Sequence, residues 1–256
     1  MSAAVDYVLP LRWDDDEGLD ELTAYLRRLS RWARVLVVDG SPAPLFGRHA
    51  ELWAGTVVHL RPDPAHACAN GKVAGVRTGM ERTLHQQVVI ADDDVRYEEE
   101  DLRRVVGLLE QADLVRPRNF FRPTPWHAAW DTARSLLNRA VAGADYPGTF
   151  AIRRSRWQAM GGYDGEVLFE NLELIRTVRA SGGREARPLD LYVARLPSSI
   201  QRFVDQRVRQ AYDDLAQPWR LAGFLAVWPT IIILVGRRQP GRLAALVAAI
   251  VGVAEA

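Results

Sequence analysis

Short apolar segments alternate with amphipathic segments along the first half of the chain, and this alternation limits the possible folds more than any other feature. The apolar segments are rich in valine, which is typical of strands buried on both faces of a sheet. They occupy residues 5–13, 34–40, 56–62, 86–94 and 112–119, with an expected break near Pro10. The amphipathic segments occupy residues 18–33, 70–84 and 98–112. Strands that alternate with helices predict an α/β fold with a mostly parallel, doubly wound sheet.

Strand-like and helix-like segments alternate less regularly in the second half of the chain, and its C-terminal end is mainly apolar. Residues 126–143, 155–162 and 171–183 are predicted helices, and residues 147–154 and 189–196 are predicted strands. Residues 221–236 carry no charge, and a second apolar run begins at Leu243, after Arg237, Arg238 and Arg242. Each run is shorter than the roughly 20 apolar residues that cross a bilayer comfortably.

Several arrangements of this apolar tail fit the sequence. They are two short membrane spans, a re-entrant hairpin, helices that lie in the membrane interface, and a buried helix pair. The N-terminus has no basic region followed by a long apolar core, so we expect no signal peptide and a cytoplasmic body. A single crossing would then place the arginines of the tail outside, against the positive-inside tendency. We therefore favour a shallow or hairpin attachment to the cytoplasmic face of the cell membrane.

Composition excludes several kinds of site. The chain has 33 basic and 32 acidic residues, and a net charge of +1 indicates no field that would attract nucleic acid. The one cysteine, Cys68, excludes an internal disulfide and a zinc cluster of cysteines. Phosphate-binding glycine motifs and a nucleophile elbow are absent. His66, His85 and His127 lack metal-ligand spacing, and we interpret them as structural.

One predicted strand runs directly into three aspartates, Asp92, Asp93 and Asp94. In an extended segment alternate side chains share a face, so Asp92 and Asp94 should point together and Asp93 away from them. Two carboxylates on one side suit a hard divalent cation that completes its shell with phosphate oxygens and water. The alternative is a solvated turn, in which aspartate is common.

Asp39 and Lys72 are further candidates at the same edge of the sheet. Asp39 ends a buried strand, and ligands of doubly wound sheets bind beyond the carboxyl ends of the strands. Lys72, the only lysine, begins a predicted helix, where a phosphate would meet both its ammonium and free backbone amides. A turn-capping aspartate and an exposed lysine without a role are the alternatives.

Two candidate groups lie in the second half. Arg207 and Arg209 stand beside Gln206 and could clamp a diphosphate, although a basic helix face in water is the alternative. Glu170 and Glu173 offer a general base, although carboxylates on the surface of a helix are mostly inert.

The order of these motifs resembles that of the family 2 glycosyltransferases, which are inverting enzymes with the GT-A fold. The motifs are V-V-D-G-S, G-K-x-x-G, I-A-D-D-D-V, G-T-F-A-I-R-R, G-G-Y-D, F-E-N-L-E-L and Q-R-V-R, and they span about residues 5–214. The resemblance implies a transferase that uses a nucleotide-diphosphate sugar and Mg²⁺ or Mn²⁺. It implies a nucleotide-sugar-binding half at 1–115, an acceptor-binding and catalytic half of the same domain at 116–218, and membrane-associating helices at 219–256.

The resemblance also implies roles for single residues. Asp39 would contact the nucleotide base, Asp92 and Asp94 the ribose and the metal, and Lys72 would lie near the nucleotide. Residues 148–149 and 153–154 would fall on the acceptor side.

The sequence departs from the family pattern at two places. The usual Glu-Asp pair, whose aspartate deprotonates the acceptor, is Glu170-Asn171 here, so we expect Glu170 to be the base, with Glu173 as the second choice. The Gln-x-x-Arg-Trp motif of membrane synthases lacks its tryptophan, which favours transfer of a single sugar. The apolar tail suggests a lipid or lipid-linked acceptor. A sugar-nucleotide-binding pseudoenzyme and a nucleotidyltransferase are the alternative functions.

Overall fold

The computed structural model describes residues 4–142, 147–167, 169–216 and 218–255. The chain forms two compact units, the first from Met1–Asn119 and Pro147–Arg195, the second from Phe120–Tyr146 and Leu196–Ala256. These units are interleaved along the chain, whereas the sequence analysis divides it into consecutive ranges at residues 115 and 218. That functional division stays a prediction.

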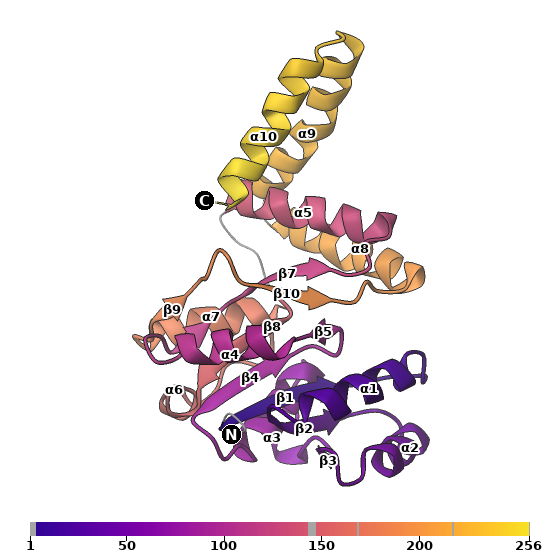
Figure 1. Ribbon diagram of the computed structural model, residues 1–256. Helices are drawn as coiled ribbons and strands as arrows, with labels where there is room; N and C mark the ends of the chain where they lie inside the picture. Colours follow the sequence, from indigo (N-terminus) through magenta and orange to yellow (C-terminus); the bar gives the residue numbers. More distant parts are fainter. Residues whose placement is uncertain (1–3, 143–146, 168, 217, 256) are drawn as a thin grey trace. The chain divides into compact units, whose positions relative to one another are not determined.

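The first unit is built on a seven-stranded sheet with the order β3-β2-β1-β4-β8-β6-β9 (Figure 1). Its strands are β1 (Val5–Leu11), β2 (Arg34–Asp39), β3 (Val58–Leu60), β4 (Gln87–Ala91), β6 (Leu114–Val115), β8 (Thr149–Arg153) and β9 (Glu185–Ala186). The four strands from β3 to β4 run parallel, which confirms the predicted α/β fold with a mostly parallel sheet. The chain then returns to insert β8 antiparallel between β4 and β6, which the sequence analysis did not anticipate.

Pro10 does not break β1, contrary to the sequence prediction. β1 pairs with β4 only as far as Val8, whereas it pairs with β2 as far as Leu11. The missing N–H of Pro10 therefore falls beyond the β4 ladder, where a proline removes no hydrogen bond on that side.

Helices cover both faces of this sheet. They are α1 (Leu19–Leu29), α2 (Ala43–Trp53), α3 (Gly71–Glu81), α4 (Glu99–Leu108), α6 (Arg154–Met160) and α7 (Glu170–Ala180), with the short helix η1 (Pro64–His66) before α3. Tyr7 and Leu9 of β1 join Leu22 and Leu26 of α1 in the main core. On the other face α3 approaches closely, because a Cβ on Gly79 would overlap the side chain of Val8. The sequence analysis did not predict α2.

A three-stranded sheet with the order β5-β10-β7 lies beside the loop that follows β4 (Figure 1). It consists of β5 (Val95–Arg96), β10 (Tyr192–Arg195) and β7 (Arg118–Phe121). Arg195, the last residue of β10, pairs with Val95. This register brings Arg195 to the three aspartates, about 100 residues earlier in the chain.

The second unit consists mainly of the helices α5 (Trp126–Ala142), α8 (Ile200–Ala216), α9 (Pro218–Gly236) and α10 (Pro240–Glu255). Within it, Trp130 of α5 stacks on Trp228 of α9, and Arg139 of α5 pairs with Glu255 of α10 at 2.7 Å. None of the described helices combines the length and apolar character needed to cross a membrane.

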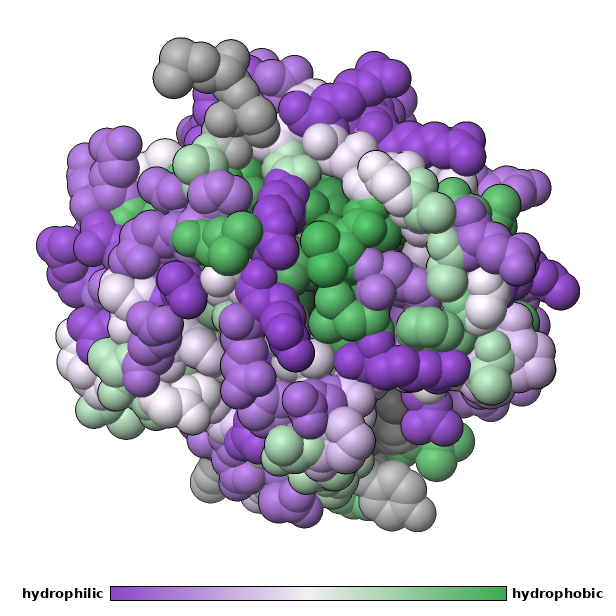
Figure 2. Space-filling view, turned by 90° about the horizontal axis from the view of Figure 1, so that it is seen from below, coloured by the Kyte–Doolittle hydropathy of each residue, from purple (hydrophilic) through white to green (hydrophobic). Residues whose placement is uncertain are grey.

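Apolar side chains are unevenly exposed. Figure 2 shows a face on which hydrophilic residues predominate and surround a smaller hydrophobic area. Helices α9 and α10, in contrast, expose large apolar side chains such as Leu225, Ile232 and Val253, each about 60% accessible or more.

Candidate active site

The loop after β4 is held firmly at the carboxyl edge of the parallel strands. The backbone N–H of Asp92 donates to the carbonyl of Gly148 (2.8 Å), and the N–H of Val95 donates to the carbonyl of Asp92 (3.1 Å). Asp92 and Asp94 both lie against Arg195, at 3.6 and 2.7 Å. Asp93 instead accepts a hydrogen bond from the indole of Trp13 (2.5 Å). Two carboxylates therefore converge, and the third is used elsewhere.

Lys72 joins this loop to the start of α7. Its ammonium lies 2.5 Å from Asp92 Oδ1 and 2.9 Å from Glu170 Oε1, and it donates to Asn171 Oδ1 at 3.3 Å. Three acceptors match the three donors of an ammonium. Burial lowers the pKa of Lys72, but Asp92 and Glu170 outweigh that effect and raise it above its ordinary range. Lys72 is therefore a fixed cation between two carboxylates.

Local capping places these side chains. Asn70 caps α3 by accepting from the backbone N–H of Lys72 (3.1 Å), and its amide nitrogen donates to Glu170 Oε2 (3.4 Å). Asn171 uses both ends of its amide, because its nitrogen donates to the carbonyl of Pro147 (3.1 Å) while its oxygen accepts from Lys72. Asn171, where the resemblance leads one to expect an aspartate, is thus part of the scaffold of the site.

Arg195 is the second cation of the site. Its Nε lies 3.1 Å from both oxygens of Asp94, and its Nη2 lies 2.7 Å from Oδ2. Burial raises the pKa of Asp94, and the nearby charge of Asp92 raises it further, whereas Arg195 lowers it. The net shift of the pKa is upward, so the ionised form of Asp94 is less favoured than in water. A further positive charge beside this carboxylate would favour the ionised form.

The structure does not bring every predicted residue into this group. Glu173 lies in α7, where Thr177 donates to it (3.4 Å). Gln206 and Arg207 lie on α8 in the second unit, and Arg207 pairs there with Asp131 at 2.7 Å. The side chain of Arg209 lies outside the described part of the chain. Roles for Gln206, Arg207 and Arg209 at a diphosphate stay predictions.

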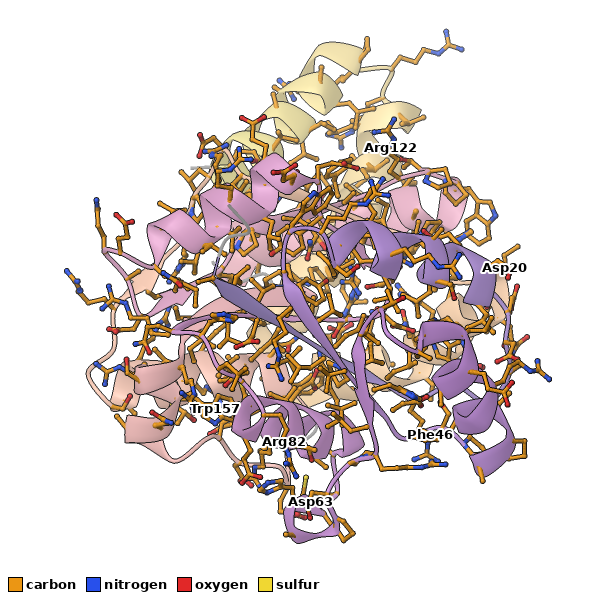
Figure 3. All side chains as sticks on the ribbon, turned by 60° about the horizontal axis from the view of Figure 1, so that its bottom comes forward. Asp20, Phe46, Asp63, Arg82, Arg122 and Trp157 are labelled. Atoms are coloured by element: carbon orange, nitrogen blue, oxygen red, sulfur yellow. The ribbon has the colours of Figure 1, made fainter. Side chains whose placement is uncertain are left out.

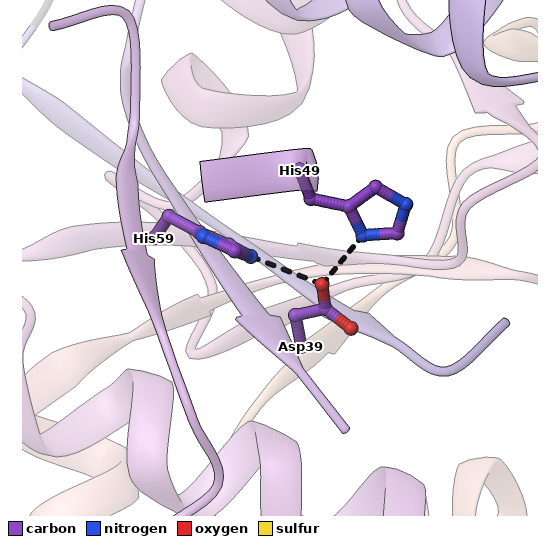
Figure 4. Close-up of side chains that lie close together, drawn as sticks. All are labelled: Asp39, His49 and His59. Carbon is purple, nitrogen blue, oxygen red and sulfur yellow. Dashed lines mark hydrogen bonds and ion pairs between the residues drawn. The ribbon is translucent and has the colours of Figure 1, made fainter. Parts of the chain in front are cut away.

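Asp39 lies in a separate cluster, with His49 of α2 and His59 of β3 (Figure 4). Both imidazoles approach the same oxygen, Asp39 Oδ2, at 2.7 and 3.0 Å, and the N–H of Ser41 donates to Oδ1 (2.8 Å). Asp39 is fully buried. Direct contact between Asp39 and a nucleotide base would therefore require its protein partners to move.

This cluster is a hydrogen-bonded network rather than a preformed metal centre. Its three ligand atoms all lie within 4.8 Å of one another, as metal ligands do. Zn–N bonds of about 2.0–2.1 Å, however, separate tetrahedral ligands by roughly 3.3 Å. The separations of 2.7 and 3.0 Å from Asp39 Oδ2 are shorter and match charge-assisted hydrogen bonds.

Aromatic rings hold the two imidazoles in place. Trp53 stacks on His49 with ring centroids 4.7 Å apart, and Phe46, labelled on α2 in Figure 3, stacks on His59 at 4.3 Å. The other ring nitrogen of His49 lies 3.1 Å from Asp16 Oδ1. Each ring nitrogen of His49 therefore faces a carboxylate oxygen, and the contact with Asp39 is one of the polar partners that a buried carboxylate requires.

Replacing His49 by leucine is expected to lower the free energy of unfolding by about 3 kcal/mol, because it leaves Asp39 buried without that partner. Urea denaturation measures this change. Arg103→Met, which removes an exposed i,i+4 pair with Glu99, should change stability by less than about 0.5 kcal/mol. Equal losses of unfolding free energy in the two variants would show that the buried network stabilises the fold no more than an exposed ion pair does.

The network also predicts a pH dependence. Burial raises the pKa of Asp39, but hydrogen bonds from His59, Ser41 and His49 outweigh burial and lower it below the ordinary value of 3.8. A carboxyl with a depressed pKa stabilises the fold above its unfolded value, and this stability is lost as the pH falls through the folded pKa. Urea denaturation of an Asp39→Asn variant should therefore show a smaller loss of stability below pH 4 than the parent protein.

No sequence pattern indicates a role at these sites for Trp13, His49, His59 or Arg195. His49 lies in the unpredicted helix α2. Trp13 is 80 residues away in the chain from its partner Asp93, and Arg195 is 101 residues away from its partner Asp94. No local pattern signals such contacts.

Solved structures of similar fold include nucleotide-sugar transferases. Glucosyl-3-phosphoglycerate synthase from Mycobacterium tuberculosis, crystallised with Mn²⁺, UDP and glucosyl-3-phosphoglycerate, has a TM-score of 0.54 and 18% identity, over 88% of this chain and 81% of that chain. The mannosyltransferase PcManGT from Pyrobaculum calidifontis, solved with GDP-Man and Mn²⁺, has a TM-score of 0.52 and 18% identity, over 98% and 85% of the two chains. The chain has the fold of nucleotide-sugar glycosyltransferases.

A third structure, GalNAc-T7 with UDP, GalNAc and Mn²⁺, has a TM-score of 0.54 and 13% identity, over 77% of this chain and 44% of that chain. No protein-family model matches the sequence, and no curated protein matches it. At identities this low the similarity shows the fold alone, and function has to be argued from the residues of the site.

Proposed function

We propose that the protein is an inverting glycosyltransferase that moves a single sugar from a nucleotide-diphosphate sugar to an acceptor hydroxyl. The observation that carries this proposal is the bridge from Lys72 to both Asp92 and Glu170, because it joins the expected donor-binding loop to the expected base. The transferases of similar fold were crystallised with nucleotides and Mn²⁺, which supports a nucleotide-sugar donor and a divalent metal here. They give no support to a nucleotidyltransferase or a pseudoenzyme.

The charges of the site fit a divalent cation. Asp92, Asp94 and Glu170 carry three negative charges against the two positive charges of Lys72 and Arg195, so the group is negative before any donor binds. A diphosphate adds further negative charge and therefore needs another cation. Asp92 and Asp94 would hold Mg²⁺ or Mn²⁺, which prefer oxygen ligands and keep several positions for phosphate and water. The metal would act as a Lewis acid for the leaving diphosphate.

Glu170 is the group that would accept the proton of the acceptor hydroxyl. It is the first residue of α7 and lies 2.9 Å from Lys72, whereas Glu173 bonds within its own helix. As the proton moves to Glu170, the acceptor oxygen bonds to the anomeric carbon on the face opposite the diphosphate. The bond between that carbon and the diphosphate oxygen breaks, and its electron pair leaves with the diphosphate. Lys72, which contacts both Asp92 and Glu170, would stabilise that charge.

A thermal-shift screen of nucleotide-diphosphate sugars, with and without Mn²⁺, tests the proposal. At least one donor should raise the melting temperature in the presence of Mn²⁺ and lose that effect with EDTA, because a ligand that binds only the folded state stabilises it. Failure of every common donor to shift the melting temperature would oppose the proposed function.

We also propose that the second unit associates with a lipid surface and that the acceptor is lipid or lipid-linked. Ile232, Ile233 and Val235 point to different sides of α9, and each is at least half exposed. A helix that is apolar all round suits lipid better than a single protein partner. On α8, the exposed Ile200, Val204 and Val208 are spaced by four residues and so form one apolar stripe.

Ile232→Asp is expected to weaken binding to phospholipid vesicles about 100-fold, since a charge within the hydrocarbon costs about 2.5–3.5 kcal/mol. Vesicle cosedimentation measures the change. Leu84→Asp is the matched control, because Leu84 lies in the first unit and is 68% exposed, against 66% for Ile232. Equal binding by the two variants, or no binding by the parent protein, would contradict membrane association. Substitution is preferable to deletion here, because α10 pairs with α5 through Glu255 and Arg139.

A further inference from the structure

Arg195 lies against both aspartates that are proposed to hold the cation. It ends β10, and its side chain is 22% exposed. Its guanidinium holds Asp94 side-on through Nε and Nη2 and lies 3.6 Å from Asp92 Oδ2. Lys72 approaches the other oxygen of Asp92, at 2.5 Å. The two cations therefore flank the aspartate pair from two sides.

The backbone keeps room for this guanidinium. A Cβ built on Gly148 would lie 2.9 Å from Arg195 Cζ and 2.9 Å from Asp92 Oδ2, closer than such atoms approach in proteins. The amide of Gly148 is fixed by Asn119 Oδ1 (2.8 Å), and its carbonyl accepts from Asp92. Residue 148 therefore has to be a glycine for Arg195 and Asp92 to stand where they do.

The chemistry of arginine suits two successive partners. Its planar fork matches a carboxylate and a phosphate equally well. Once a divalent cation binds Asp92 and Asp94, each carboxylate has less negative charge to offer Arg195. A diphosphate bound to the same cation would then be the strongest acceptor within reach of the guanidinium.

We propose that Arg195 is a diphosphate-binding residue of the donor site, an inference that rests on the proposed function. Without donor, Asp94 holds the guanidinium in place. With donor and metal, the guanidinium donates to the diphosphate and stabilises the charge that develops as the sugar leaves. A merely structural ion pair between Arg195 and Asp94 is the competing explanation, and it predicts no contribution to diphosphate affinity.

Isothermal titration calorimetry with methylenediphosphonate in saturating Mg²⁺ separates the two explanations, since this probe carries no base and no sugar. Arg195→Met is expected to weaken its binding about 10- to 100-fold, the range for losing one or two charge-assisted hydrogen bonds. Arg195→Lys should restore only part of the affinity, because an ammonium lacks the fork. Arg104→Met is the matched control, as it removes an exposed pair with Asp190 (2.7 Å), and it should bind like the parent protein.

Gly148→Ala tests the same site without removing a charge. Its added methyl group should displace Arg195 and Asp92 and weaken methylenediphosphonate binding about 10-fold, with Arg195 still present. Unchanged affinity in Arg195→Met would overturn the proposal, even if a nucleotide-diphosphate sugar binds the parent protein and Gly148→Ala binds more weakly. Failure of the parent protein to bind any nucleoside diphosphate would instead refute the proposed function.

Discussion

Replacing Glu170 by glutamine is expected to lower turnover at least about 100-fold while leaving donor affinity nearly unchanged. A general base typically contributes roughly 10²–10⁴-fold, and an interaction made mainly in the transition state affects kcat more than binding. Glutamine keeps an oxygen that can accept from Lys72, so the bridge between α3 and α7 should survive. Steady-state kinetics on a confirmed acceptor, with donor affinity from calorimetry, measures both effects.

Glu173→Gln is the matched control for this substitution. Glu173 lies one turn further along α7 and contacts Thr177, so its replacement should leave turnover within a few-fold of the parent protein. An active Glu170→Gln together with an inactive Glu173→Gln would place the base at Glu173. If both variants were fully active, the base would lie on another element.

Asp94→Asn is expected to abolish metal-dependent donor binding, with at least a 100-fold loss of affinity. The substitution removes one of the two carboxylates that would hold the cation and leaves Arg195 with a neutral partner. The fold should persist, because Asp94 lies in a loop at the sheet edge and its side chain is 30% exposed. Calorimetry of donor binding with Mn²⁺ and with EDTA measures the effect.

Asp93→Asn provides the control within the same three residues. Asp93 accepts from Trp13, and asparagine can accept the same hydrogen bond, so metal-dependent binding should be retained. Donor affinity that depends neither on Mn²⁺ nor on Asp94 would disprove a metal site at these aspartates.

The alternation of strands and helices predicts the parallel half of the sheet because each strand is a local apolar run, and β1, β2 and β4 are buried on both faces. The sequence also predicts a strand at residues 147–154, which is β8, but it does not predict where this strand joins the sheet, since no local pattern records that it pairs antiparallel with β4. Helix α2 escapes prediction for a different reason. Pro42 and Pro44 begin it, and only two of its residues, His49 and Trp53, are buried. A helix with so small a buried face shows no clear apolar period.

The site, like the fold, is predicted from the sequence only where local patterns decide it. The strand-end rule places Asp39 and Asp92 at one edge of the sheet, and Lys72 lies at the start of α3 as its sequence context indicates. The position at a strand end does not indicate that His49 and His59 bury Asp39, whereas Asp92 stays partly accessible. Partners that come from distant elements decide which aspartate faces a ligand.

Asn171 is a further case in which tertiary contacts alter a prediction from sequence. From the sequence alone, Asn171→Asp is expected to be tolerated, because the pattern of the family 2 glycosyltransferases has an aspartate at this position. The Asn171 amide, however, donates to the carbonyl of Pro147 at 3.1 Å, and an aspartate would set two acceptors against each other. We therefore expect Asn171→Asp to lower the free energy of unfolding by about 1–3 kcal/mol, the cost of leaving an acceptor without a donor. Urea denaturation measures this loss, and unchanged stability would show that the amide contact is dispensable.

The most direct test of the proposed function is the anomeric configuration of the first product, followed by proton NMR while the protein consumes a bound donor in Mn²⁺. Hydrolysis or transfer by an inverting enzyme must give the configuration opposite to that of the donor, and Glu170→Gln should suppress the signal. A product with the donor's own configuration would contradict the assignment of Glu170 as base. A donor that binds but is never consumed would contradict the proposed transferase activity itself.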